Sequence, residues 1–172
     1  MLKPVRRGWD AAGGFDMNNV AIVTDAAITK FMIHGVPDRP GAAAEMFSRV
    51  GAAGINIHMM AASGAERGRT DISLTVADDD AARVVSMLES AKAELEASSV
   101  SQRSDVAAVS LVADGLAKSP GIAGRMFRTL SAEGINIDMI SAANTAVTCL
   151  IDARFLEAAT QALKREFRLE LA

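Results

Sequence analysis

The stretch PGAAAEMFSRVGAAGINIHM, residues 40–59, returns in altered form as PGIAGRMFRTLSAEGINIDM, residues 120–139. Eleven of the twenty aligned positions carry the same residue, in order Pro, Gly, Ala, Met, Phe, Ala, Gly, Ile, Asn, Ile and Met. Each copy opens on Pro-Gly, continues with apolar residues at helical spacing, and reaches a glycine before an alternating apolar segment. The chain is therefore built from two copies of one unit.

The residues around the first copy predict the order strand, helix, strand, strand, helix, strand. The strands contain β-branched and apolar residues, and the turns contain proline and glycine. Three consecutive aspartates suit the beginning of a helix, where carboxylates meet unpaired N–H groups. The predicted elements are strands at 28–36, 55–61, 70–76 and 99–103, and helices that follow the turn at 37–41 and the aspartates at 78–80.

The second copy repeats this order with one strand missing. Its predicted elements are strands at 106–113, 135–141 and 146–152, a helix after the turn at 118–121, and a helix over 154–167. Two segments remain for the missing edge strand, NNVAIVT at 18–24 and FRLEL at 167–171. The sequence leaves the choice between them open.

A repeat of β-α-β-β-α-β, about 70–80 residues long, is the ferredoxin-like arrangement, in which two helices pack on one face of an antiparallel sheet. We therefore expect an α+β fold of two tandem ferredoxin-like units. The predicted boundaries are a flexible N-terminal tail over 1–17, a first domain over 18–103 and a second over 104–172. The strand at 18–24 is a candidate to pair with the second domain.

The composition argues against several classes of function. With a net charge of −3, 4% aromatic residues and no tyrosine, nucleic acid is not an expected partner. No run of about 20 apolar residues suggests a membrane span, and no apolar segment near the N-terminus suggests a secretory signal. The single cysteine, Cys149, excludes an internal disulfide and suits a reducing cytoplasm, which is the expected location.

The strand-to-helix turn at 37–43 is the binding feature that the residues themselves indicate. First-turn N–H groups lack partners within the helix and can bind a carboxylate, helped by the helix dipole. Pro40 has no N–H, so Ala42 and Ala43 are the predicted donors, and the acidic Asp38 is placed for an ammonium group. The second copy offers a similar turn at Ser119, Gly121 and Ile122, with Asp114 as the nearest acid.

These motifs resemble the two ACT modules in the regulatory part of aspartate kinases. The first module is matched by GVPDRPGAAAEMF, GINIHMM and GRTDISLTV, and the second by VAAVSLVADGLAKSPGIAGRMFRTLSAEGINIDMIS. The resemblance runs from about residue 18 to about residue 168. It implies a non-catalytic subunit or domain that binds lysine or threonine in feedback regulation, forms a homodimer, and acts on a kinase catalytic subunit.

No feature of the sequence indicates that the chain itself catalyses a reaction. The kinase domain of the family, with its Lys-Phe-Gly-Gly segment, has no counterpart, and no Gly-rich phosphate loop precedes a helix. His34 and His58 lie apart on predicted strands and do not form a metal-ligand pattern. We therefore expect no catalytic residue, no cofactor and no metal, and an independent enzyme is the weakest alternative.

The resemblance also implies where the effectors bind. In the family, each pocket forms where the turn of one module faces the Asn-Ile strand of the other. The first site would join Asp38, Pro40, Gly41, Ala42 and Ala43 to Asn136, Ile137 and Asp138. The second site would join Ser119, Pro120, Gly121 and Ile122 to Asn56, Ile57 and Met60.

The sequence departs from the family in the strands that line these pockets. Ala62 stands where the family usually has a glutamine, and Ala142, Ala143 and Asn144 stand where it commonly has Thr-Ser-Glu. Each lost hydrogen-bonding partner would weaken ligand binding by about 1–3 kcal/mol. Two alternatives therefore stay open. One is an orphan tandem-ACT sensor that regulates a different enzyme, and the other is a structural dimerisation module with inactive pockets.

Overall fold

The computed structural model describes residues 20–64, 66–116 and 119–169, and divides them into two compact units. The first unit contains residues 27–106, and the second contains residues 107–169 together with residues 20–26. The elements are β1 (Val20–Pro37), α1 (Ala42–Ala52), β2 (Met59–Ala62), β3 (Arg69–Ala77), α2 (Asp78–Ala91), β4 (Ser99–Ala113), α3 (Ile122–Ala132), β5 (Ile137–Ala142), β6 (Ala146–Asp152), a 3-10 turn (Ala153–Phe155) and α4 (Leu156–Glu166).

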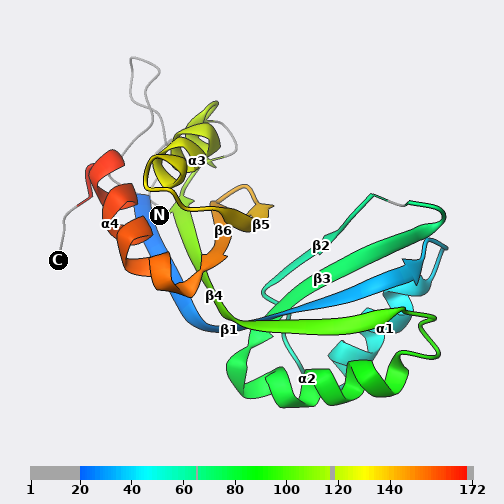
Figure 1. The fold of residues 1–172 in the computed structure, drawn as a ribbon. Coiled ribbons are helices and arrows are strands. Elements are labelled where there is room, and N and C mark those ends of the chain that lie inside the picture. The colour runs from blue at the N-terminus through cyan, green and yellow to red at the C-terminus, as the bar shows by residue number, and fades with distance from the viewer. Residues whose placement is uncertain (1–19, 65, 117–118, 170–172) are drawn as a thin grey trace, which may run out of the picture. The chain divides into compact units, whose positions relative to one another are not determined.

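The strand order is β2-β3-β1-β4-β6-β5. The first unit uses the part β2-β3-β1-β4 of this order, and the second uses the part β1-β4-β6-β5. Figure 1 shows that α1 and α2 lie on one face of the first sheet, and that α3 and α4 cover the second sheet in the same way. The structure therefore confirms the α+β fold of two tandem ferredoxin-like units.

Two strands are longer than the sequence pattern predicts. β1 joins the segments predicted as separate strands at 18–24 and 28–36, and β4 joins those at 99–103 and 106–113. Residues 20–26 belong to the second unit, where Val20 and Ile22 pack against its core. The N-terminal segment therefore takes the edge position that the sequence left open. The alternative segment, FRLEL, begins as a turn after α4, and its last two residues lie outside the described part.

The core of the first unit lies between its sheet and its two helices. Phe31 of β1 faces Leu74 of β3 in the antiparallel register, and both are fully buried. Met46 of α1 and Leu88 of α2 pack into the same cluster. Each large apolar side chain buried in this way contributes about 1.5–3 kcal/mol to the hydrophobic driving force.

The second unit has its own core of the same design. Met126 of α3 and Leu163 of α4 are fully buried against β6, which contributes Cys149. Burial in this apolar cluster raises the pKa of the Cys149 thiol to about 12. Cys149 is therefore a packing residue of this core.

Both Asn-Ile strands begin later than the sequence predicts. β2 begins at Met59 rather than at residue 55, and β5 begins at Ile137 rather than at residue 135. The Ile55 N–H bonds the Val50 carbonyl at 3.2 Å, and the Ile135 N–H bonds the Leu130 carbonyl at 3.0 Å. These bonds close the helix ends, so the first residues of each Asn-Ile segment are held away from the ladder.

Candidate functional site

The turn between β1 and α1 leaves two backbone donors open. The Ala42 N–H bonds the Arg39 carbonyl at 3.2 Å and is therefore occupied. The next two N–H groups, of Ala43 and Ala44, bond no acceptor among the described residues, and both residues are exposed. The open donors thus lie one position further along the helix than the pair predicted from the sequence.

Charged side chains surround this turn. Arg39 donates two parallel hydrogen bonds to Glu45, at 3.0 Å to Oε1 and 3.1 Å to Oε2. This contact lowers the pKa of Glu45 and raises the pKa of Arg39. The Asp38 carboxylate is exposed and has no partner among the residues that the structure describes, so it is accessible to an ammonium group.

The turn before α3 has the same backbone pattern with different side chains. The Ile122 N–H bonds the Ser119 carbonyl at 3.3 Å, and the N–H groups of Ala123 and Gly124 meet no acceptor in the described part of the chain. The Ser119 hydroxyl donates to the Gly115 carbonyl at 3.2 Å, and Ser119 is only 7% exposed. Ser119 therefore stabilises the turn from inside, and the backbone supplies the open donors.

The two Asn-Ile segments are exposed in the same pattern. Asn56 and Asn136 lie on the surface, whereas Ile57 and Ile137 are half-buried and pack against their respective cores. Met60 is 56% exposed on β2. The asparagine side chains are thus accessible to a ligand, and the isoleucines anchor the segment that carries them.

The residues that depart from the family pattern are exposed as well. Ala62 ends β2 and Ala142 ends β5, and both lie at the surface. Ala143 and Asn144 follow in the exposed loop to β6. The polar groups that the family has at these positions would therefore be accessible, and this chain offers methyl groups in place of most of them.

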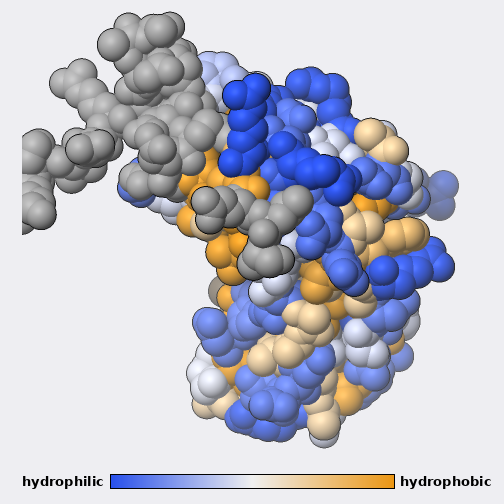
Figure 2. Space-filling view, turned by 90° about the vertical axis from the view of Figure 1, so that its left-hand side faces the viewer, coloured by the Kyte–Doolittle hydropathy of each residue, from blue (hydrophilic) through white to orange (hydrophobic). Residues whose placement is uncertain are grey.

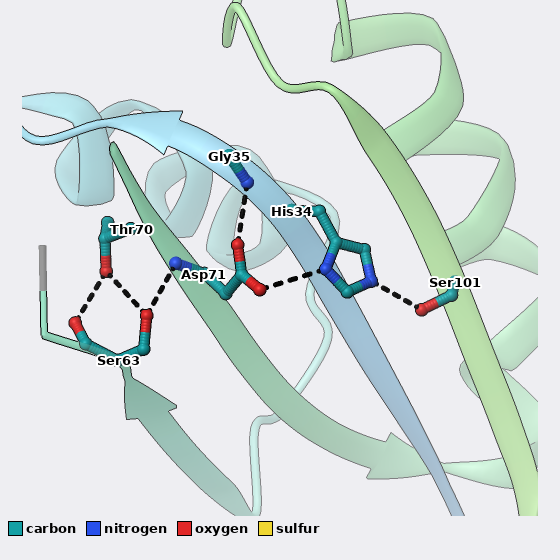
Figure 3. A network of polar contacts seen from close by, with 6 residues as sticks. All are labelled: His34, Gly35, Ser63, Thr70, Asp71 and Ser101. Atoms are coloured by element: carbon teal, nitrogen blue, oxygen red, sulfur yellow. Dashed lines mark hydrogen bonds and ion pairs between the residues drawn. The ribbon is translucent and has the colours of Figure 1, made fainter. Parts of the chain in front are cut away.

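A polar network that sequence reasoning missed connects three strands of the first unit (Figure 3). The Asp71 carboxylate of β3 accepts the Gly35 N–H at 2.8 Å through Oδ1 and lies 3.0 Å from His34 Nδ1 through Oδ2. His34 Nε2 lies 3.0 Å from the Ser101 hydroxyl of β4. The hydrogen bond from the Gly35 backbone, followed by that from His34, lowers the pKa of Asp71.

A cavity of about 500 Å³ lies at the hairpin between β2 and β3. Its lining is polar and contains Ser63, Gly64, Glu66, Arg67, Arg69 and Asp71. In the second unit a groove of about 320 Å³ is lined by residues of α3 and α4, with the ion pair of Glu133 and Arg165 at its rim. Neither hollow is lined by the open donors of the two turns.

Metal chemistry finds no support in the described ranges, where no three His, Cys, Asp or Glu side chains gather closely enough to hold an ion. Within the same ranges, no helix is both long and apolar enough to cross a membrane.

The family model of the ACT domain matches two stretches of the sequence, residues 32–91 and residues 109–167. Together these stretches cover more than half of the chain. This chain belongs to the ACT domain family. Each matched stretch contains one copy of the repeated motif, at 40–59 and at 120–139.

Curated relatives of this ACT chain are aspartate kinases. The enzyme of Stutzerimonas stutzeri is 34% identical over 154 residues, which are 90% of this chain and 37% of that relative. The aspartokinase of Thermus thermophilus is 31% identical over 179 residues, which are 98% of this chain and 44% of that relative. The chain thus spans less than half the length of these relatives.

Solved structures show which part is shared. The ligand-free regulatory subunit of the Thermus thermophilus aspartate kinase superposes with a TM-score of 0.81 at 31% identity, over 85% of this chain and 96% of that chain. A structure of aspartokinase alpha and beta subunits superposes with a TM-score of 0.81 at 35% identity, over 86% of this chain and 97% of that chain. The tandem ACT sequence therefore corresponds to nearly the whole of that regulatory subunit.

Proposed function

We propose that this chain is a non-catalytic regulatory subunit or domain of aspartate kinase that binds lysine or threonine as an allosteric effector. The observation that carries the proposal is the pair of open donors on each ACT turn, at Ala43 and Ala44 and at Ala123 and Gly124. The near end-to-end match with a regulatory subunit supports the assignment to aspartate kinase. A cytoplasmic location accompanies this proposal.

The chemistry of the turns fits a free amino acid. Two adjacent backbone N–H groups at a helix N-terminus bind a carboxylate, and the helix dipole adds to the attraction. In the first unit the Asp38 carboxylate is accessible for the ammonium group. The pairing of each turn with the Asn-Ile strand of the other module stays a prediction from the family resemblance, and with it the roles of Asn56, Asn136 and Asp138.

Effector binding regulates an enzyme only if the effector prefers one arrangement of the protein. We infer that lysine or threonine favours the ACT arrangement that holds a kinase catalytic subunit in its inhibited state. The coupling is reciprocal, so binding of the kinase subunit would change the affinity for the effector by the same factor.

The exposed alanines favour one alternative, an orphan sensor of another amino acid. Ala62 and Ala142 remove hydrogen-bonding groups from the ends of β2 and β5. A binding site that loses such groups discriminates differently among ligands that differ in one polar group. An amino acid with a less polar side chain than lysine would fit this change.

We also propose that the chain forms a homodimer. β2 and β5 stand at the two ends of the strand order, so each has a hydrogen-bonded neighbour on one side only. Both strands expose an apolar side chain, Met60 at 56% and Ile140 at 50%. Figure 2 shows one face, on which hydrophobic areas lie among hydrophilic side chains. An edge strand has unpaired backbone groups and can pair with a strand of another chain. Sedimentation at rising concentration tests this, and a persistent monomer of 18.0 kDa would exclude it.

Calorimetric titration tests the binding function. The wild-type chain should bind lysine or threonine saturably, and Ala43→Glu should lose the site in the first unit, because its carboxylate competes for the open donors. The matched control is Ser48→Glu, which adds the same charge to an exposed position later in α1. Binding of a different amino acid would favour the orphan sensor. No binding across all twenty amino acids would overturn the sensor function and favour the dimerisation module.

A further inference from the structure

We propose that Asp71 and Arg69, at the hairpin between β2 and β3, are positioning residues that hold the effector-binding turn of the first unit. The second unit has Ala146 at the position equivalent to Asp71, so we expect its turn to lack this carboxylate contact and to bind an effector more weakly. The inference rests on the proposed function, and it concerns residues that contact the backbone before the turn rather than the ligand.

The hairpin first fixes Gly35, the residue at which β1 leaves the regular ladder. The β1–β3 register shifts between Ile33 and Val36, and Gly35 has a φ of 62°. A residue at such an irregularity loses part of its ladder pairing. Asp71 Oδ1 accepts the Gly35 N–H at 2.8 Å, and Arg69 Nη1 donates to the Gly35 carbonyl. Both polar groups of the Gly35 backbone are thus satisfied by side chains of β3.

The hairpin then fixes the beginning of the turn. The Asp38 N–H bonds the Gly68 carbonyl at 2.9 Å, at the tip of the hairpin. The same Arg69 Nη1 that bonds Gly35 also donates to the Glu96 carbonyl at 2.8 Å, which ties the hairpin to the segment after α2. Three contacts therefore hold the segment 35–38 from outside, a few residues before those that carry the open donors.

The hairpin of the second unit is shorter, and among the described residues it reaches β4 through the Ala113 N–H, which bonds the Thr145 carbonyl at 2.9 Å. Ala62 pairs with Ile72 in the first unit, and Ala142 pairs with Val147 in the second. Nine residues, 63–71, separate the first pair, whereas four residues, 143–146, separate the second. The residue before Val147 is Ala146, at the position that Asp71 has before Ile72. β4 accordingly ends at Ala113, whereas β1 continues to Pro37.

A held turn binds more tightly than a mobile one, because ordering a loop on binding costs conformational entropy. The turn of the first unit is already fixed by Asp71, Arg69 and the carbonyl of Gly68. The first unit should therefore have the higher affinity for the amino-acid carboxylate.

Two readouts on the full chain test this inference. Amide hydrogen exchange follows the N–H groups of Gly35 and Asp38, and NMR titration with lysine and threonine follows the amide signals of Ala43 and Ala123. Asp71→Ala should speed exchange at Gly35 by about tenfold and weaken the affinity seen at Ala43 by a similar factor, with the affinity seen at Ala123 unchanged.

Two further variants separate positioning from general stability. Asp71→Asn keeps an oxygen that can accept the Gly35 N–H, and it should restore most of the affinity. Ser101→Ala removes a partner of His34 at the far end of the network and should change neither readout. If Asp71→Ala does not fold, Asp71→Asn alone tests the inference, through an intermediate rise in Gly35 exchange.

The outcomes distinguish this inference from the proposed function. If neither lysine nor threonine binds the wild type, their assignment as effectors fails. The exchange rates still test whether Asp71 and Arg69 hold the backbone before the turn. Unchanged exchange at Gly35 and Asp38 in the Asp71 variants would overturn the positioning role. Equal loss of affinity at Ala43 and Ala123, or no loss at either, would overturn the difference between the two turns.

Discussion

The turns before α1 and α3 have equivalent open backbone donors, but different side-chain contacts stabilise the two turns. In the first unit, Arg39 and Glu45 pair across the turn, and the hairpin reaches the backbone through Asp71. In the second unit, the Ser119 hydroxyl bonds the Gly115 carbonyl within the turn itself. A repeated motif thus preserves the backbone donors, while the side chains that hold them have diverged.

The position of Glu45 shows how far this divergence extends. Its counterpart in the second copy is Arg125, which donates to Glu166 Oε1 at 2.9 Å and lies over the Phe167 ring at 4.7 Å. The first residue serves the turn, and the second joins α3 to the end of α4. The equivalent helices α1 and α3 therefore have similar buried residues, whereas their exposed residues make different contacts.

The largest expected effect tests whether the two cores are equivalent. Met46 and Met126 occupy matching positions and are 1% and 0% exposed. Met46→Ala and Met126→Ala should each lower the free energy of unfolding by about 2–5 kcal/mol, because each leaves a cavity in a packed core. Urea denaturation measures this cost. A variant that unfolds at the wild-type urea concentration would show that its core is not packed as described.

The next effect concerns the glycines that begin α1 and α3. Gly41 and Gly121 have φ angles of 97° and 84°, in the left-handed region. A Cβ would meet no atom closer than 3.9 Å at Gly41 and none within 4 Å at Gly121, so only backbone strain opposes alanine. Gly41→Ala and Gly121→Ala should each cost about 1–2 kcal/mol.

Gly51 provides the control for these two substitutions. It lies within α1, has open space around its Cα and has no positive φ. Gly51→Ala should therefore stabilise the chain by about 0.5–1 kcal/mol, since alanine restricts the unfolded backbone more than glycine does. The same change of residue is thus expected to have opposite signs inside the helix and at its N-cap.

A smaller effect is expected from the contact that only the second unit has. Arg125→Ala removes the partly exposed bond to Glu166 and the contact with the buried Phe167 ring. Thermal unfolding should show a loss of about 1 kcal/mol. Arg125→Lys should recover only part of it, because an ammonium group does not reproduce the two guanidinium bonds, from Nε to the Glu166 carboxylate at 2.9 Å and from Nη2 to the Glu166 backbone carbonyl at 3.1 Å. Full recovery by lysine would contradict the role of this second bond.

The smallest effect is a difference in acid stability. The pKa of Asp71 in the folded chain is lowered, chiefly by the Gly35 N–H and then by His34. Its stabilisation is fully present above the pKa of an unfolded aspartate, about 3.9, and is lost as the pH falls through the folded value. The gap in stability between wild type and Asp71→Asn should therefore narrow below about pH 4. Unfolding measured between pH 3 and about pH 6 checks this, and a constant gap would contradict the role of Gly35.

Local patterns predicted most of the elements from the sequence. The β-branched and apolar residues at 70–76 predicted β3, and the aspartates from Asp78 onward predicted the beginning of α2. Each of these signals lies within a few residues of the feature it predicts. For the same reason the order of elements and the α+β fold class followed correctly from the repeat.

No comparable local signal indicates the contacts that hold the first turn. Asp71 and Gly35 are separated by 36 positions, and nothing local to either indicates that a carboxylate meets a backbone N–H. The sequence pattern also could not predict which backbone N–H groups stay open, because the Ala42 N–H donates to the Arg39 carbonyl in the folded turn. The continuity of β1 and β4 was hidden by polar and small residues that interrupt the alternation.

NMR titration of the isotope-labelled chain with lysine and with threonine tests most directly whether the two turns bind a carboxylate. The amide signals of Ala43 and Ala44 should shift saturably, with weaker binding at Ala123 and Gly124. Saturable binding that leaves all four amide signals in place would contradict the assignment of the turns as carboxylate sites.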